Sequence, residues 1–250
     1  YEQRGEPERA LELLRGLVHS DAVYAAGRMT KMAELYVRLG RQADGIAYFE
    51  SLQGQGAHWE EGRNTALGVV YAAAGRSQDA ERALKRALAV DPSCVPAMQE
   101  LFPLYDSQGR AAELEPLLRR GLQKEPRSGM FNNWLALVLK RTGRLRDAEM
   151  AFRQTLEVAP DLIGAMANLG GLYLQEGRAT EAVAVLTSAI EKEPRNVESR
   201  ANLIVALGLE HNLEQARGQL AAAEELGQRA PVLYNALAYA LHVNGRQQEA

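Results

Sequence analysis

Glycines recur along this chain at intervals of 34 residues, and this period constrains the fold more than any other feature of the sequence. The period is kept by Gly75, Gly109, Gly143, Gly177 and Gly245, and continued upstream by Gly40 and Gly5 at a spacing of 35. One slot holds His211 in place of glycine. A period of roughly 20 to 50 residues is typical of a stack of similar units, each of which packs on its neighbours. The sequence therefore predicts a repeat protein.

Apolar residues on both sides of each glycine predict that the repeating unit is a hairpin of two helices. Leu169 and Tyr173 precede Gly177, and Ala182 and Leu186 follow it. Steps of three and four residues place such side chains on one stripe of a helix. Small residues, such as glycine and alanine, recur in the same registers of successive copies, which predicts that the two antiparallel helices approach closely.

The turn between the two helices is predicted to need a residue with positive φ, which glycine adopts without steric cost. Where His211 takes the place of glycine, the following Asn212 is predicted to adopt the left-handed conformation. In most copies arginine follows the glycine directly, as in Gly143-Arg144 and Gly177-Arg178.

A proline ends each hairpin in the middle of the chain, and a helix-capping residue one or two positions later is predicted to start the next hairpin. The prolines are Pro92, Pro126, Pro160 and Pro194, and the predicted caps are Ser93, Ser128, Asp161 and Asn196.

The small-residue registers, the tyrosine one turn before the glycine and the closing proline together resemble the tetratricopeptide repeat family, over essentially the whole chain. This resemblance implies an all-α fold, a right-handed superhelical solenoid of antiparallel hairpins with the first helices lining a concave groove. We expect a single array over residues 1–250 with about seven repeats and both ends truncated. The predicted copies are 1–25 (partial), 26–60, 61–94, 95–128, 129–162, 163–196, 197–230 and 231–250 (partial).

Composition and motifs argue against several classes of function. The net charge of −3 and the pI near 5.9 do not fit a nucleic-acid groove, which normally shows a basic surplus. No apolar run approaches the roughly 18 residues that span a bilayer. The single cysteine, the spacing of the four histidines and the lack of phosphate-binding or nucleophile motifs imply no metal, no cofactor and no catalytic site. Abundant arginine and alanine suggest a bacterial source, whereas the compartment stays unknown.

Repeat register predicts which side chains of the first helices line the groove. The candidate binding residues are Asn133, Trp134, Leu137, Asn168, Gln175, Asn202, Asn235 and Tyr239. Asn168 and Asn202 share one register, and the pair resembles the asparagine ladder of the array in O-linked N-acetylglucosamine transferases, which clasps a peptide backbone. An amide both donates and accepts hydrogen bonds, so a row of them can hold any extended main chain. The alternative is that these asparagines only cap or solvate a polar helix face.

Trp134 takes the place of a ladder asparagine in the preceding copy. An exposed indole in a groove would be an anchor for a partner, because aromatic residues dominate binding hot spots. The alternative is that Trp134 packs between hairpins. The family's clamp for a C-terminal carboxylate is not matched, since its positions hold residues such as Thr65, Val69 and Met130.

These observations favour a scaffold that binds a peptide or partner protein in the groove and is not itself an enzyme. A second hypothesis is an accessory region of a larger bacterial enzyme, such as a glycosyltransferase or a sulfatase-like hydrolase, in which the array recruits substrate or packs on the catalytic domain. A third is end-to-end self-association, because the exposed apolar faces at the uncapped ends of a repeat array tend to associate with one another. The stripes predicted to lack neighbours are Leu11, Leu14 and Leu17 at one end and Leu237 and Leu241 at the other.

Overall fold

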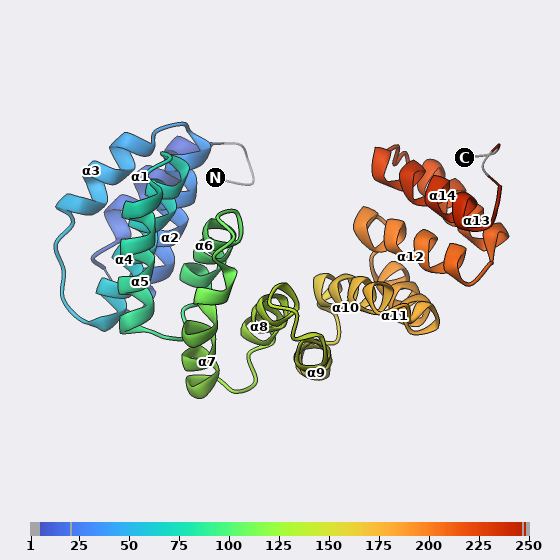
Figure 1. The fold of residues 1–250 in the computed structure, drawn as a ribbon. Coiled ribbons are helices and arrows are strands. Elements are labelled where there is room, and N and C mark those ends of the chain that lie inside the picture. Colours follow the sequence, from blue (N-terminus) through green and yellow to red (C-terminus); the bar gives the residue numbers. More distant parts are fainter. Residues whose placement is uncertain (1–5, 21, 247, 249–250) are drawn as a thin grey trace. The chain divides into compact units, whose positions relative to one another are not determined.

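The computed structural model describes residues 6–20, 22–246 and 248, and every regular element in this part of the chain is a helix (Figure 1). The chain divides into two compact units, unit 1 at residues 1–126 and unit 2 at residues 127–250. Unit 1 contains α1 (Pro7–Leu17), α2 (Ala22–Arg38), α3 (Gln42–Ser51), α4 (Ala57–Ala73), α5 (Ser77–Val90), α6 (Val95–Asp106), a 3-10 helix (Ala111–Leu114) and α7 (Glu115–Lys124). Unit 2 contains α8 (Gly129–Arg141), α9 (Leu145–Val158), α10 (Ile163–Gln175), α11 (Ala179–Lys192), α12 (Val197–Leu209), α13 (Leu213–Glu225) and α14 (Pro231–Val243).

Tight turns join the helices of each hairpin where the glycine period predicts them. Gly40, Gly75, Gly109, Gly143, Gly177 and Gly245 all have φ between 68° and 77°. The N–H groups of the glycine and of the next residue close the last turn of the first helix. Gly177 N–H donates to the carbonyl of Leu174 at 3.1 Å, and Arg178 N–H donates to the carbonyl of Tyr173 at 2.8 Å. Gly5, the first glycine of the predicted series, lies outside the described residues.

The turn without glycine corrects one prediction. His211 itself takes the left-handed conformation with φ of 57°, whereas Asn212 has φ of −98°. The prediction for Asn212 is therefore wrong. Two contacts favour the observed arrangement, because the His211 ring contacts the Asn244 side chain, Nδ1 to Oδ1, at 2.7 Å and the Asn212 side chain caps α13 by accepting from the Gln215 amide.

The arginine after the turn glycine ties neighbouring hairpins together. Arg178 stacks over the Tyr173 ring at 4.3 Å and pairs with Glu149 of α9, the second helix of the preceding hairpin, at 2.7 Å. The Tyr173 hydroxyl donates to the same Glu149 at 3.2 Å. This tyrosine–glutamate–arginine cluster is repeated in unit 1 by Tyr105, Glu81 and Arg110. The hydrogen bonds from Arg110 hold the pKa of the Glu81 carboxyl down at about 2.

The caps of the first helices were predicted correctly in two of four copies. Ser128 and Asn196 are N-caps, and their side chains accept from the backbone amides of Phe131 and Ser199. The predictions for Ser93 and Asp161 are wrong, because α6 is preceded by Cys94 and α10 by Leu162 at the cap position. Ser93 instead donates both its amide and its hydroxyl to the Asp91 carboxylate within its own loop.

Close approach of helices depends on glycines inside them. A Cβ on Gly170 would lie 2.5 Å from Cγ of Leu186, which brings α10 and α11 of one hairpin together. A Cβ on Gly208 would lie 2.7 Å from the backbone Cα of Ala240, which brings together α12 and α14, the first helices of successive hairpins. The predicted close packing of the two helices of a hairpin is therefore confirmed at Gly170, whereas Gly208 brings together two successive hairpins.

Gly177→Ala is expected to lower the free energy of unfolding by about 1 kcal/mol, because an L side chain is strained at φ of 73°. Gly218→Ala in α13 is the matched control, since a Cβ at either position meets nothing within 4 Å. Gly218 is an exposed helical residue, so its replacement is expected to raise the free energy of unfolding by up to about 1 kcal/mol. Urea unfolding followed by circular dichroism measures both, and changes of the same sign would contradict the prediction.

Candidate functional site

The first helices of unit 2 place the predicted binding residues along one face. In this unit α10 contacts both α8 and α12, and α12 contacts α14. We define the first-helix face by its accessible residues, one set from each helix. They are Leu137 and Lys140 of α8, Asn168, Gly171 and Gln175 of α10, Asn202 of α12, and Asn235 and Tyr239 of α14.

A cavity of about 270 Å³ lies on this face between α8 and α10. It is lined by Leu137, Lys140, Arg141, Asn168 and Gln175. Three of the eight predicted residues, Leu137, Asn168 and Gln175, are therefore brought together around one hollow. Asn168 and Gln175 come from the same stripe of α10, since they are seven residues apart.

Asn168 and Asn202 lie on the neighbouring helices α10 and α12, and each is half-buried. Neither side-chain amide makes a hydrogen bond to any residue that the structure describes. An unused amide that is partly withdrawn from water keeps both its donor and its acceptor available for a ligand.

Two predicted residues do not lie on the accessible face. Trp134 is 7% exposed and packs edge-to-face on the Phe131 ring at 5.6 Å, and Asn133 is 9% exposed. The prediction of an exposed indole is therefore wrong, and the alternative of a packed tryptophan describes the structure. Trp134 occupies the same repeat position as Asn168. Burial of a large apolar ring is favourable, however, whereas an amide is well solvated by water.

Asn235 and Tyr239 lie further along, on α14. Both are exposed, and Tyr239 keeps 48% of its surface accessible. They do not line the cavity between α8 and α10. The structure thus places them on the first-helix face, one helix beyond Asn202.

Repeat register also predicts Lys140 and Gly171 on this face, although neither is among the candidate binding residues, and both contribute to it. A Cβ on Gly171 would lie 3.5 Å from Nζ of Lys140 and 3.8 Å from Nδ2 of Asn202. Partial burial lowers the pKa of the Lys140 ammonium, and the neighbouring Arg141 charge acts in the same direction. The sequence signal for Gly171 is its place three residues after Asn168, on the same stripe of α10.

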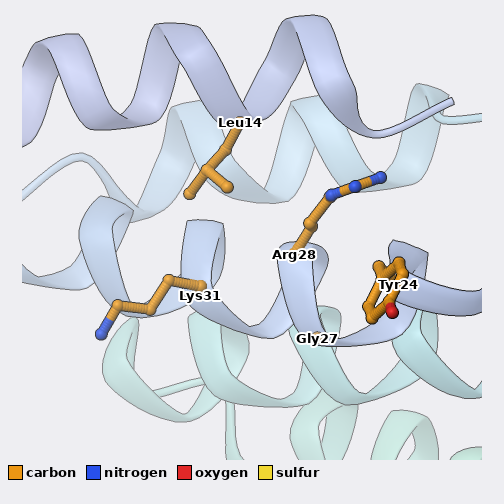
Figure 2. Close-up of a pocket in the computed structure, with 5 residues that line it drawn as sticks. All are labelled: Leu14, Tyr24, Gly27, Arg28 and Lys31. Carbon is orange, nitrogen blue, oxygen red and sulfur yellow. The ribbon is translucent and has the colours of Figure 1, made fainter. Parts of the chain in front are cut away.

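Unit 1 has a separate hollow of about 400 Å³ between α1 and α2, lined by Leu14, Tyr24, Gly27, Arg28 and Lys31 (Figure 2). Leu14 points from α1 toward α2, while Arg28 and Lys31 extend away from each other. Tyr24 is 62% exposed, and the Arg28 guanidinium lies 5.7 Å from the centre of its ring.

The apolar stripes predicted to lack neighbours are mostly covered. Leu11 and Leu241 are each 2% exposed, so the prediction is wrong for these two, which pack within their own units. Leu14 and Leu237 are half-buried, and Leu17 is 38% exposed. End-to-end self-association stays a prediction.

Within residues 6–20, 22–246 and 248, no group of three or more histidine, cysteine, aspartate or glutamate side chains is arranged to hold a metal ion. Cys94 is buried and donates to the Glu61 carboxylate at 2.8 Å, and burial raises the pKa of its thiol to about 12. None of the helices in the described part of the chain combines the length and the apolar character needed to cross a membrane.

Comparison with known families finds two models, each described as a tetratricopeptide repeat. One matches residues 173–240, and the other matches residues 65–99 and 135–197. Together they cover more than half of the chain. No curated protein matches the sequence.

Among solved structures, the chain is similar to PilW, described as a widely conserved type IV pilus biogenesis factor. The TM-score is 0.68 at 15% identity, over 85% of this chain and 98% of PilW. It is also similar to PilF of Pseudomonas aeruginosa (TM-score 0.62, 18% identity, 78% of this chain and 90% of PilF). A third is YrrB, described as a TPR protein with an unusual peptide-binding site (TM-score 0.53, 19% identity, 73% of this chain and 91% of YrrB). The predicted all-α stack of helical hairpins is confirmed.

Proposed function

Since the chain belongs to the tetratricopeptide repeat family, we propose that it is a protein-interaction scaffold that binds an extended peptide along the first-helix face of unit 2. The observation that carries this proposal is the pair of half-buried amides of Asn168 and Asn202. They lie in the same register of two helices in contact, and neither is used in a hydrogen bond within the described residues.

Amides in this position suit a peptide main chain. Each residue of an extended peptide presents a carbonyl acceptor and an amide donor, and an asparagine side chain complements both. Leu137, on the wall of the hollow beside Asn168, supplies apolar surface for a side chain of the same peptide. Exposed Tyr239 supplies further contact area one helix beyond Asn202. The peptide-binding site of YrrB, a protein of similar fold, supports the proposal.

The proposal predicts that the double variant Asn168→Ala/Asn202→Ala binds peptide at least about tenfold more weakly than the parent, because two hydrogen-bonding amides are lost. The full chain would first select peptides from a random displayed library, and the affinity of a selected peptide would then be measured by fluorescence anisotropy. The matched control is Gln154→Ala/Gln215→Ala, which removes two exposed amides from the second helices α9 and α13. Equal affinities of the parent and the Asn168/Asn202 variant would contradict the proposal.

The hypothesis of an accessory region predicts a different outcome of the same selection. If the first-helix face packs on another domain of the same chain, the library yields no binder that depends on Asn168 and Asn202. The assignment of residues 1–250 to one array of about seven repeats likewise stays a prediction.

A further inference from the structure

The ammonium group of Lys140 lies over α10 rather than in open water. Lysine normally extends its charged end into solvent, even when its carbon chain is packed. Here the Nζ atom is 3.5 Å from the point where a Gly171 Cβ would stand, and Nδ2 of Asn202 is 3.8 Å from the same point. The first helices α8 and α12 thus each direct one hydrogen-bond donor at the space above Gly171 of α10, the helix between them.

In the part of the chain that the structure describes, the Lys140 ammonium has no carboxylate at ion-pair distance. Within the described residues, Lys140 makes no salt bridge or hydrogen bond. Glu198 on α12 acts on Lys140 from a distance, but burial and the Arg141 charge outweigh it, so that the ammonium pKa is lowered. A partly desolvated cation beside a second cation is stabilised by a bound anion, because the anion restores the interactions lost from water.

We propose that Lys140, Gly171 and Asn202 form an anion subsite that holds the side-chain carboxylate of an aspartate or glutamate in an extended peptide. This inference rests on the proposed function, since it names the chemistry of the peptide. The two oxygens of one carboxylate can accept from Nζ of Lys140 and Nδ2 of Asn202 together, because both atoms lie within 4 Å of one point. The absent side chain of Gly171 leaves the room for it.

A side-chain carboxylate fits better than the carboxylate at the end of a peptide. The first-helix face continues on both sides of the anion subsite. On one side is the hollow, with Leu137 and Asn168 on its wall. On the other side, beyond Asn202, are Asn235 and Tyr239 of α14. A peptide that uses these surfaces passes over Gly171 and does not end there.

Parallel selections test the anion subsite. The full parent chain and its Lys140→Met variant would each select from a random library displayed with no free C-terminus. The parent is expected to enrich aspartate or glutamate at one fixed peptide position, and Lys140→Met to select peptides without that enrichment. Arg146→Met is the matched control, because it removes an exposed cation from α9 and leaves the same net charge.

A peptide pair that differs by Glu→Gln at the enriched position then gives the size of the effect. This change is expected to weaken binding to the parent about tenfold and binding to Lys140→Met less than twofold, since the charged hydrogen bond is already lost there. Gly171→Ala is a second variant, and its added methyl makes ordinary contacts with Lys140 and Asn202 without a clash. It is expected to be at least as stable as the parent, because alanine favours the helix more than glycine does, and to lose the preference for glutamate.

Three outcomes would overturn the anion subsite. If the parent selects peptides that depend on Asn168 and Asn202 but shows no acidic enrichment, the subsite is wrong and the proposed function stands. If acidic peptides bind the parent and Lys140→Met equally, the acidic preference arises elsewhere on the chain. If neither chain selects a peptide, both the subsite and the proposed function fail.

Discussion

Trp134→Ala is expected to lower the free energy of unfolding by about 4 kcal/mol, which is the largest effect of any single substitution considered. The indole is 7% exposed and lies against the Phe131 ring. Its removal therefore leaves a cavity and loses the buried apolar contacts of a large side chain. Urea unfolding followed by circular dichroism measures the loss.

The matched control is Tyr239→Ala, which removes an aromatic ring that is 48% exposed on α14. Its expected cost is less than about 1 kcal/mol, as for most surface substitutions. Similar costs for both variants would contradict the packed position of Trp134. The comparison also bears on binding assays, because a chain destabilised at Trp134 loses affinity for reasons unrelated to peptide contacts.

Gly208→Leu is expected to lower the free energy of unfolding by about 3 kcal/mol, because a side chain at this position collides with the backbone of the neighbouring helix. A Cβ there would lie 2.7 Å from Cα of Ala240, and a backbone atom moves aside less readily than the end of a side chain. The helices α12 and α14 would have to separate. Hydrogen exchange of the amides in these two helices locates the effect.

Gly218→Leu provides the control for helix propensity, since Gly218 is also a helical glycine in unit 2 and a Cβ there meets nothing within 4 Å. The free energy of unfolding of the Gly218→Leu variant is expected to equal or exceed that of the parent. A Gly208→Leu variant as stable as Gly218→Leu would show that α12 and α14 are not as close as the structure places them.

The hairpins were predictable from sequence because each copy of the repeat has the same turn glycine and the same spacing of apolar and small residues. A glycine with φ near 70° is required at each turn, so its period gives the positions of the turns directly. The small-residue registers, such as Gly170 against Leu186, follow from the close approach of paired helices. Each copy supports the interpretation of the others.

Individual positions within the copies were less predictable, since neighbours in space decide them. His211 takes the left-handed conformation that was predicted for Asn212, and the contact of its ring with Asn244, 33 residues later, accompanies it. Asp161 looked like a helix cap, but its carboxylate pairs with Lys192 of the following second helix. Both choices depend on partners that sequence spacing alone does not reveal.

The candidate site was predicted in part. Register alone identified Asn168 and Gln175, which share a cavity with Leu137. Register could not show that Trp134 and Asn133 turn away from water, because exposure depends on side-chain size and on the helices packed around them. It also could not show the meeting of Lys140 and Asn202 above Gly171, since these residues belong to three different helices.

Amide chemical-shift mapping of the full chain with a selected peptide tests most directly where the ligand binds. Binding along the first-helix face predicts that the shifts concentrate in α8, α10, α12 and α14, with the side-chain amides of Asn168 and Asn202 among the most affected. Shifts confined to the second helices α9, α11 and α13 would contradict it.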